Sequence, residues 1–288
     1  MNARDAAPLT IAPYARRYRH AVRDLMFRSY RVHSHLDWHE SEEWLETDQY
    51  PIQLAFYGDR LVGFIAMSKP LGGTSWVRLA VLSDQADGTT VLGGLWAEIT
   101  RELRQYGVTK VAILINPDWI LSYLRSFQFK PAEEIITLIR PQIAIPDMPL
   151  VEGISLRLMR REEVAAITAV DQYAFAPPWQ MDVSELRQAE KISALATVAL
   201  YEHEIVGYSL YTITMEGAHL ARLAVLPAFQ GRGVASLILV DALQRFMRRS
   251  ILRMSVNTQG TNVRSQRLYL RYGFARNGYD LPVWMLDL

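Results

Sequence analysis

The stretch LAVLPAFQGRGVAS, residues 223–236, decides how this chain is interpreted. An apolar, strand-like run meets Pro227, and Gly231 and Gly233 then flank Arg232 just before a run with helical character. The first turn of a helix has N–H groups without intrahelical partners and the positive end of the helix dipole, so it attracts anions. Because glycine has no side chain to keep an anion away from these amides, the stretch predicts a cradle for a phosphate or pyrophosphate.

Two better-known phosphate loops do not fit this stretch. No Lys-Ser/Thr pair follows the glycines, as a P-loop requires. The glycine spacing is not that of a dinucleotide fingerprint, and no repeating βαβ unit surrounds it. Taken alone, the loop is also consistent with a tight strand-to-helix connection that binds nothing.

The chain contains one sequence unit twice. Three pairs of segments match in the same order at an offset of 144 to 146 residues: RLAVL at 78–82 and 222–226, YGDRLVGF at 57–64 with YEHEIVGY at 201–208, and YLRSFQF at 123–129 with YLRYGF at 269–274. Such repetition indicates two copies of one domain. We predict domains at 1–140 and 154–288, joined by the proline-rich, extended linker 141–153.

Both copies show the same order of elements. A strand leads into an amphipathic helix, a loop with tryptophan, a hairpin, the long RLAVL strand, a helix, a strand, a short helix and a closing strand. This order predicts the α/β class with α+β character: each domain has a central mixed, largely antiparallel sheet flanked by helices.

Two motifs of the C-terminal copy carry a family resemblance. LAVLPAFQGRGVA, followed about 25 residues later by NVRSQRLYLRYGF, resembles the GNAT superfamily of acyl-CoA-dependent N-acetyltransferases. The glycine-containing motif is similar to the family's Q/R-x-x-G-x-G/A loop, with Gln230, Gly233 and Ala235 at the defining positions. The later motif resembles the family's N-x-x-A/S-x-x-L-Y-x-x-x-G-F segment: Asn262, Ser265, Leu268, Tyr269, Gly273 and Phe274.

The resemblance implies acetyl-CoA as co-substrate and no metal. Backbone amides at the start of the helix would hold the pyrophosphate, and the free edge of the preceding strand would bond the pantetheine arm. The implied cofactor-binding residues are Leu223, Ala224, Val225, Gln230, Gly231, Arg232, Gly233, Val234, Ala235, Ser236 and Asn262. Tyr269 would protonate the departing thiolate, although an aromatic residue packed between helix and sheet is the alternative interpretation.

The general base is less clearly marked. Glu216 lies just ahead of the strand, where the resemblance implies such a residue, and an ordinary solvated turn is the alternative. His219 is the reserve, because strict alternation puts it on the same face as Leu223 and Val225. The segment AFAPPWQM, residues 174–181, would form part of the acceptor wall, or else a stiff turn with Trp179 in the core.

The N-terminal copy lacks the glycine loop. SDQADGTT, residues 83–90, replaces it, so that Gly88 aligns with Arg232 and Thr89 with the key glycine. Asp84 and Asp87 would repel a pyrophosphate. We predict a degenerate GNAT-like domain that has lost cofactor binding, an arrangement similar to tandem acetyltransferases such as mycothiol synthase.

One segment of the N-terminal copy resembles a metal motif. HSHLDWH, residues 33–39, is similar to the H-x-H-x-D-H pattern of metallo-β-lactamase-like hydrolases, but Trp38 is inserted before the last histidine. The repeat alignment also places it between the first two helices and not after a strand. We interpret it as a polar loop and predict no metal site.

Composition limits the remaining classes. The net charge is +1, which argues against nucleic acid as the main partner. The chain has no cysteine, no signal-peptide-like start and no apolar run of membrane-spanning length, so we expect a cytoplasmic protein. The expected partner is a small-molecule or peptide amine acceptor, and the protein is expected to be a monomer or homodimer. A non-catalytic acyl-CoA-binding or sensing protein is the alternative function.

Overall fold

The computed structural model describes residues 7–35, 51–116, 118–141 and 144–288. The chain divides into two compact units, one of residues 1–132 together with 281–288 and the other of residues 133–280. Within the described ranges, no helix is long and apolar enough to cross a membrane.

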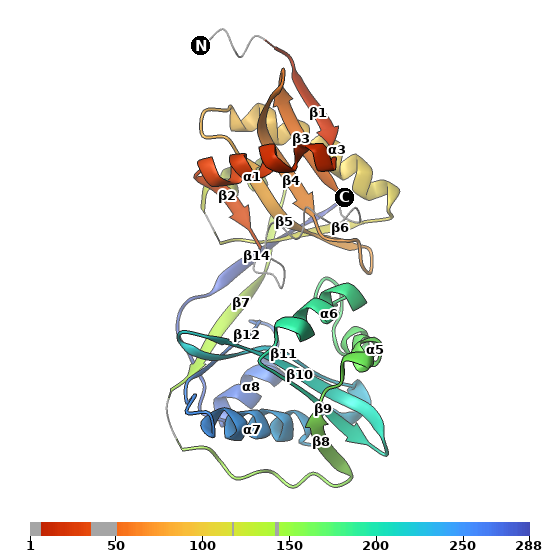
Figure 1. Cartoon of the computed structure of the whole chain (residues 1–288), viewed down its shortest axis with the longest axis vertical. Helices are drawn as coiled ribbons and strands as arrows, with labels where there is room; N and C mark the ends of the chain where they lie inside the picture. The colour runs from red at the N-terminus through yellow and green to blue at the C-terminus, as the bar shows by residue number, and fades with distance from the viewer. Residues whose placement is uncertain (1–6, 36–50, 117, 142–143) are drawn as a thin grey trace. The chain divides into compact units, whose positions relative to one another are not determined.

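The first unit holds most of the N-terminal half and the last strand of the chain (Figure 1). Its helices and strands are β1 (Leu9–Pro13), α1 (Arg19–Arg28), β2 (Arg31–Ser34), β3 (Ile52–Tyr57), β4 (Arg60–Met67), β5 (Thr74–Leu82), α3 (Gly88–Gln105), β6 (Lys110–Leu114), α4 (Leu121–Ser126) and β14 (Leu281–Asp287). The strand order is β1-β3-β4-β5-β6-β14, with β2 paired to β5.

The second unit repeats this plan. Its elements are β7 (Lys130–Arg140), β8 (Ile154–Leu158), α5 (Val164–Ala174), α6 (Val183–Ile192), β9 (Leu195–Tyr201), β10 (Glu204–Thr214), β11 (Gly217–Val225), α7 (Val234–Met247), β12 (Met254–Gln259), α8 (Val263–Arg271) and β13 (Ala275–Arg276). The strand order is β8-β9-β10-β11-β12-β7, with β13 also paired to β7. Only β5 with β6, and β11 with β12, run parallel among the described pairs. The predicted class, two mixed and largely antiparallel sheets flanked by helices, is confirmed.

The two units exchange their closing strands. β7 follows the N-terminal sequence copy but pairs with β12 and β13 of the second unit, and β14 follows the C-terminal copy but pairs with β6 of the first unit. Figure 1 shows the C-terminal end of the chain beside β6. The division after residue 132 and before residue 281 therefore differs from the predicted domains 1–140 and 154–288, which gave each copy its own closing strand.

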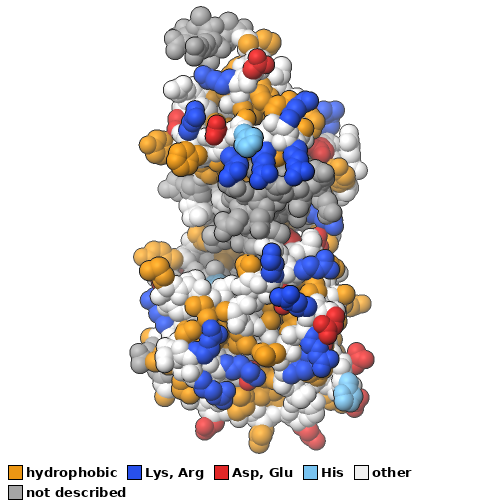
Figure 2. All heavy atoms as spheres, in the orientation of Figure 1, with side chains coloured by type: hydrophobic (Ala, Val, Ile, Leu, Met, Phe, Trp, Pro, Cys, Tyr) orange, Lys and Arg blue, Asp and Glu red, His pale blue; other side chains and the backbone are white. Residues whose placement is uncertain are grey.

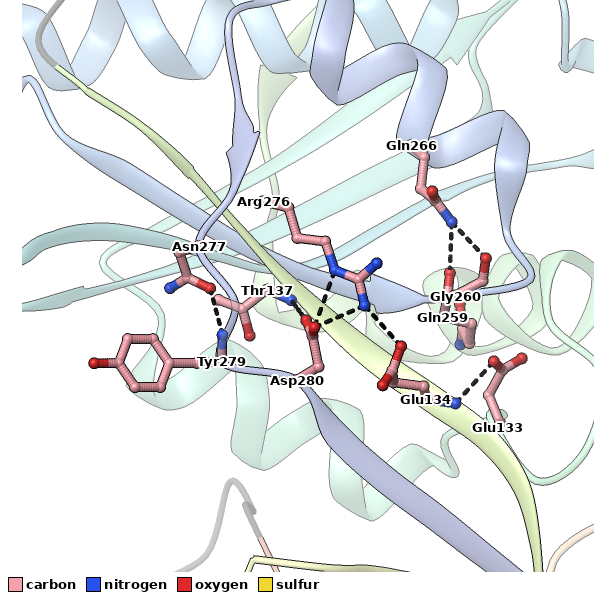
Figure 3. Close-up of polar contacts among 10 residues, drawn as sticks. All are labelled: Glu133, Glu134, Thr137, Gln259, Gly260, Gln266, Arg276, Asn277, Tyr279 and Asp280. Carbon is pink, nitrogen blue, oxygen red and sulfur yellow. Dashed lines mark hydrogen bonds and ion pairs between the residues drawn. The ribbon is translucent and has the colours of Figure 1, made fainter.

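Apolar and polar contacts both fix β7 in the second unit. Ile136 and Leu138 are buried in the core beneath α7 and α8. Among the polar contacts, Arg276 binds Glu134 at 2.7 Å and Asp280 at 2.7 Å, and the Thr137 N–H donates to Asp280 Oδ1 at 3.2 Å (Figure 3). A sequence pattern within one copy contains none of these partners, since they come from segments more than 130 residues away.

Each sheet is covered on both faces. In the first unit, α3 packs on a core that includes Leu95 and Ile99, and α1 covers the opposite face through Val22. In the second unit, α5 and α6 lie against β10, and α7 packs on β9, β10 and β11 (Figure 1). The site predicted from the sequence thus lies where β11 leads into α7.

One strand was not expected. Arg31–Ser34 form β2, which pairs antiparallel with β5 and places His33 opposite Ala80. The prediction that HSHLDWH follows no strand is therefore wrong for its first residues, while residues 36–39 of the motif lie outside the described part of the chain. The physical reason is that β5 is buried along its whole length and offers a sheet edge that β2 completes.

Candidate functional site

β11 and β12 separate in the middle of the sheet. Their parallel pairing is limited to Ala218, His219 and Leu220 of β11, whereas β10 stays paired with β11 as far as Val225. The edge of β11 from Ala221 to Val225 therefore has no strand partner on its β12 side among the described strands. An extended ligand can bond such an edge in the way an added strand does.

The N-terminus of α7 lies at the end of this open edge. Gly233 is the N-cap residue, with φ of +89°, and no side chain caps the helix. Gly231 also has a positive φ, +78°, and nothing lies within 4 Å of the position where a Cβ would stand. The N–H groups from Gly231 to Ser236 donate to no acceptor with good geometry in the described residues. These are the properties of an anion site on backbone amides.

The other predicted loop residues support this arrangement in different ways. Gln230 Nε2 donates to the carbonyl oxygen of Val225 at 2.9 Å, and its Oε1 accepts from Arg264 of α8. Arg232 is exposed, and its guanidinium lies 5.2 Å from the ring centre of Phe229. Gln230 thus fixes the loop against the strand, while Arg232 adds positive charge beside the free amides.

Buried residues hold the two elements that meet at this loop. Val234 of α7 packs in one apolar cluster with Val225 of β11, and Leu223 contacts that cluster and the neighbouring core. Ala224 and Ser236 are also buried, and Ala235 is half-buried. For these residues the amides, rather than the side chains, are available to a ligand.

The later motif, NVRSQRLYLRYGF, places Tyr269 in the core near the separation of β11 and β12. Tyr269 is 4% exposed and packs in the cluster that contains Leu220 and Val256. Burial raises the pKa of its hydroxyl above the usual value, so the group keeps its proton at neutral pH. Asn262 caps α8, since its Oδ1 accepts from the Ser265 N–H at 3.1 Å.

Glu216 lies in a solvated turn. It is in the β10–β11 hairpin, its side chain is 78% exposed, and it forms an ion pair with Arg253 at 3.7 Å. It precedes Leu220 by four residues, about 13 Å along an extended strand. Glu216 therefore lies in a surface ion pair, which fits the alternative interpretation of an ordinary solvated turn.

His219 lies closer to the separation of the strands, but on a different face from the one predicted. The β10–β11 register skips Ala221, so that Tyr211 pairs with Leu220 and Leu210 with Arg222. This bulge breaks the alternation of side chains, and Leu220 lies on the same face as Leu223. The prediction that His219 shares a face with Leu223 and Val225 is wrong for this reason. Its Nδ1 lies 2.9 Å from Ser255 Oγ, and burial lowers its pKa.

The corresponding loop of the first unit is closed by its own side chains. Four residues separate Leu82 from the N-cap Asp87, whereas six separate its repeat equivalent Leu226 from the N-cap Gly233. The alignment of Gly88 with Arg232 is therefore wrong by two residues, because two residues are missing from the loop and Gly88 is the first residue of the helix. The Asp87 carboxylate accepts from the Thr90 N–H at 3.1 Å, and Arg31 donates to the carbonyl oxygens of Ser83 and Ala86.

The strand separation is also present in the first unit. β5 pairs with β6 only from Thr74 to Trp76. Beyond that point β2 pairs with Leu79 to Leu82 of β5, and a small apolar cavity is lined by Val77 and Ala80 of β5, Ile113 of β6 and Trp96 of α3. In the first unit β2 thus covers the part of β5 that corresponds to the open edge of β11.

Of the first two histidines of HSHLDWH, His33 is fully buried and His35 is half-buried. Neither ring nitrogen of His33 has a hydrogen-bond partner, and burial lowers its pKa to about 4. Burial also lowers the pKa of His35, whose ring lies 5.0 Å from that of Trp76. In the described part of the chain no three His, Cys, Asp or Glu residues form a group that could hold a metal.

The arginines near the end of α7 have ordinary partners. Arg245 binds Asp241 one turn earlier at 2.6 Å, Arg253 pairs with Glu216, and Arg249 lies 6.0 Å from the ring centre of Phe246. On the face shown in Figure 2, the Lys and Arg side chains of the second unit are distributed among hydrophobic ones. These contacts agree with a solvated helix end.

Sequence reasoning missed two residues beside the site. Arg222 of β11 forms a buried ion pair with Asp171 of α5 at 2.7 Å. The repeat could have identified Arg222, because Arg78 occupies the equivalent position in the first RLAVL segment. Nothing in the helical pattern of α5 distinguishes Asp171 from a solvent-exposed carboxylate, although it is fully buried.

Comparison with known proteins agrees with this geometry. Residues 161–274 match the sequence profile of the Acetyltransferase (GNAT) family. A [ribosomal protein bS18]-alanine N-acetyltransferase of Haemophilus ducreyi is 26% identical over 118 residues, covering 39% of this chain and 80% of that protein. A Bacillus subtilis protein, provisionally given the same name, is 23% identical over 124 residues, covering 43% of this chain and 82% of its own.

A solved structure matches both units in fold. The tandem GNAT protein from the clavulanic acid biosynthesis pathway aligns with a TM-score of 0.65 and 14% identity, covering 97% of this chain and 98% of that one. The profile match falls on the unit that carries the open strand edge and the helix without a side-chain cap. Residues 161–274 of the second unit are therefore an acetyltransferase domain of the GNAT family, similar in sequence to relatives named as N-acetyltransferases.

Proposed function

We propose that the second unit transfers an acetyl group from acetyl-CoA to a primary amine by direct attack of the amine on the thioester. The observation that carries this proposal is the N-terminus of α7, where Gly231 to Ser236 present N–H groups without partners and two glycines have positive φ. Acetyl-CoA supplies the activated acyl group, and the protein supplies binding, orientation and proton transfer.

The residues present fit a diphosphate. The amides from Gly231 to Ser236 bind it, the positive end of the α7 dipole favours its charge, and exposed Arg232 adds a cation. The open edge of β11 at Leu223 to Val225 bonds the amide groups of the pantetheine arm. Asn262 and Gln230 keep α8 and the loop in place.

Tyr269 is the proposed general acid. Its raised pKa keeps the hydroxyl protonated, and its position beside Leu220 puts it where the two strands separate. The hydroxyl donates its proton to the thiolate that leaves when the C–S bond of the thioester breaks. The amine nitrogen forms the new bond to the acetyl carbon.

The amine must lose a proton to become a nucleophile, and we propose His219 as the base, with Glu216 as the alternative. The lowered pKa of His219 keeps it neutral at pH 7, and its contact with Ser255 Oγ fixes the ring. Glu216 is an exposed carboxylate already paired with Arg253. A histidine with a lowered pKa is neutral at physiological pH and can accept the proton of the amine.

The acceptor is proposed to be a small-molecule or peptide amine. The relatives' names, which specify an alanine of ribosomal protein bS18, put peptide amino groups first in the panel to be tested. Polyamines, aminoglycosides and free amino acids complete the panel.

The decisive experiment is CoA release measured with a thiol reagent. The chain has no cysteine, so every thiol that appears comes from CoA. The proposal expects acetyl-CoA to raise the melting temperature and at least one amine to accelerate thiol release above the hydrolysis rate. If acetyl-CoA stabilises the protein but no amine accelerates release, the non-catalytic acyl-CoA-binding alternative is supported; if it does not bind at all, both are rejected.

A further inference from the structure

Asp171 is a fully buried carboxylate that joins three parts of the second unit. Its Oδ2 accepts from the Tyr208 hydroxyl of β10 at 2.5 Å and from Arg222 Nε of β11 at 2.7 Å. Its Oδ1 accepts from Arg222 Nη2 and from the Met181 N–H, both at 2.9 Å. Four donors thus satisfy both oxygens, as a buried charge requires.

Arg222 completes the connection from the other side. Its Nη2 also donates to the carbonyl oxygen of Trp179 at 2.5 Å, and its guanidinium carbon lies 3.7 Å from the ring centre of Phe175. Burial opposes the charge of this guanidinium, but the Asp171 carboxylate outweighs it and the pKa of Arg222 is raised. The planar guanidinium makes both bonds to Asp171 and stacks on an aromatic ring, which a lysine cannot do.

The result is a firmly held segment between α5 and α6. The two buried side chains fix the backbone of this segment at the Trp179 carbonyl and the Met181 N–H. The Gln180 side chain adds a bond to the carbonyl oxygen of Gln172 at 2.9 Å. The ion pair therefore fixes the position of this segment in the second unit.

The same arginine belongs to the cofactor strand. Arg222 stands directly before Leu223, at the start of the open edge, and immediately after the bulge at Ala221. Its side chain leaves β11 on the face covered by α5, opposite to the face of Leu220 and Leu223. The position of the 175–181 segment is therefore set relative to the edge of β11.

We propose that Asp171 and Arg222 are positioning residues that hold the Phe175–Met181 segment as the wall against which the acceptor amine is oriented. This inference rests on the proposed transferase function. The pair touches neither substrate in the proposal; it acts through the segment, so that loss of the pair impairs use of the acceptor and leaves acetyl-CoA binding intact.

The test uses Arg222→Lys in the full chain, with Arg157→Lys as the matched control. Arg157 forms a two-bond ion pair with Glu163, at 2.9 and 2.5 Å, in the same unit but at β8. For Arg222→Lys we expect a rise of about tenfold or more in the KM for the acceptor, with the Kd of acetyl-CoA changed by less than about twofold. Hydrogen exchange of residues 175–181 should accelerate in this variant only.

The results that would contradict this proposal differ from the result that would contradict the proposed function. Equal acceptor KM values for Arg222→Lys and Arg157→Lys, or unchanged exchange of residues 175–181, overturn the proposal. A loss of acetyl-CoA affinity as large as the rise in acceptor KM also overturns it, because the pair then serves the cofactor strand. If the wild-type protein transfers no acetyl group, the proposed function fails instead.

Phe175→Leu provides another variant if Arg222→Lys does not fold by circular dichroism. It removes the ring that lies on the guanidinium while both charges stay in place. A smaller rise in acceptor KM together with faster exchange of residues 175–181 supports the proposal. Wild-type values of both quantities reject it.

Discussion

Asp87 and Gly233 occupy the same position in the two units, the residue directly before the first turn of the long helix. The Asp87 carboxylate accepts from the Thr90 hydroxyl and the Thr90 N–H, and these bonds lower its pKa. Gly233 has no side chain, and no side chain of the described residues caps its helix. Helix α3 is therefore capped by a carboxylate of the chain itself, whereas the first-turn N–H groups of α7 are available to an anionic ligand.

The first prediction follows from this pair. Calorimetric titration should give one acetyl-CoA per chain, because the Asp87 carboxylate caps the helix of the first unit, whereas no side chain caps the helix of the second. Asp87→Gly should not create another site, since the loop before it is two residues shorter. A stoichiometry of two for either protein contradicts this account.

Gly231→Ala should weaken acetyl-CoA binding by about tenfold or more, because the new Cβ stands at the amides that hold the diphosphate. Gly278→Ala is the control. Gly278 also has a positive φ, +83°, with nothing within 4 Å, so both variants carry the same backbone cost of about 1 kcal/mol. Titration calorimetry of the two variants separates ligand contact from strain; equal affinities would mean that the loop does not touch the ligand.

Tyr269→Phe should lower kcat by about 10²-fold while the Kd of acetyl-CoA stays within about twofold. The hydroxyl is needed only when the thiolate leaves, and the ring keeps its place in the core. Tyr123→Phe, the repeat equivalent in the first unit, should leave kcat unchanged. The kcat values of the two variants are compared by steady-state kinetics at saturating acceptor. A fully active Tyr269→Phe enzyme would show that Tyr269 is not the general acid.

The pH profile of kcat/KM should identify the base. His219 has a pKa below its usual value, so the wild-type rate should stay level from about pH 8 to below about 6.5 and fall only at more acid pH. His219→Gln should lower kcat/KM by about 10²-fold and remove the acid limb. Glu216→Gln should retain both rate and profile; the reverse pattern would make Glu216 the base.

The first unit should lose stability in acid. The pKa of His33 falls from 6.5 to about 4 on folding, so the unfolded state binds the proton more readily. The contribution is fully present above pH 6.5 and is lost as the pH falls toward 4, by about 2 kcal/mol between about pH 7.5 and 5 for this group.

His33→Gln should reduce this acid loss, and exposed His20→Gln should not. The free energy of unfolding is measured by urea titration at about pH 7.5 and about pH 5. Hydrogen exchange of β5 reports the part of it that belongs to the first unit. A pH dependence unchanged in His33→Gln would show that other groups, such as His35, cause it.

Much of the site could be predicted because its signals are local. Glycines that need positive φ, a helix that begins without a capping side chain, and a strand ending at Pro227 all lie within 14 residues. The repeat supplied the same order of elements twice, and the structure confirms mixed, largely antiparallel strand pairing in both units. The face of His219 could not be predicted, because alternation assumes a regular strand and the bulge at Ala221 is set by pairing with β10.

The sequence by itself determined the duplicated architecture, the glycine loop and the loss of that loop in the N-terminal copy, because each depends on backbone preferences of neighbouring residues. Tertiary structure alone decided which sheet receives each closing strand and which carboxylate meets Arg222. Those choices depend on hydrogen bonds and burial between segments about 50 to more than 130 residues apart, as between Arg222 and Asp171 or between Arg276 and Glu134. A pattern read along the chain contains no information on such partners until the sheet is assembled.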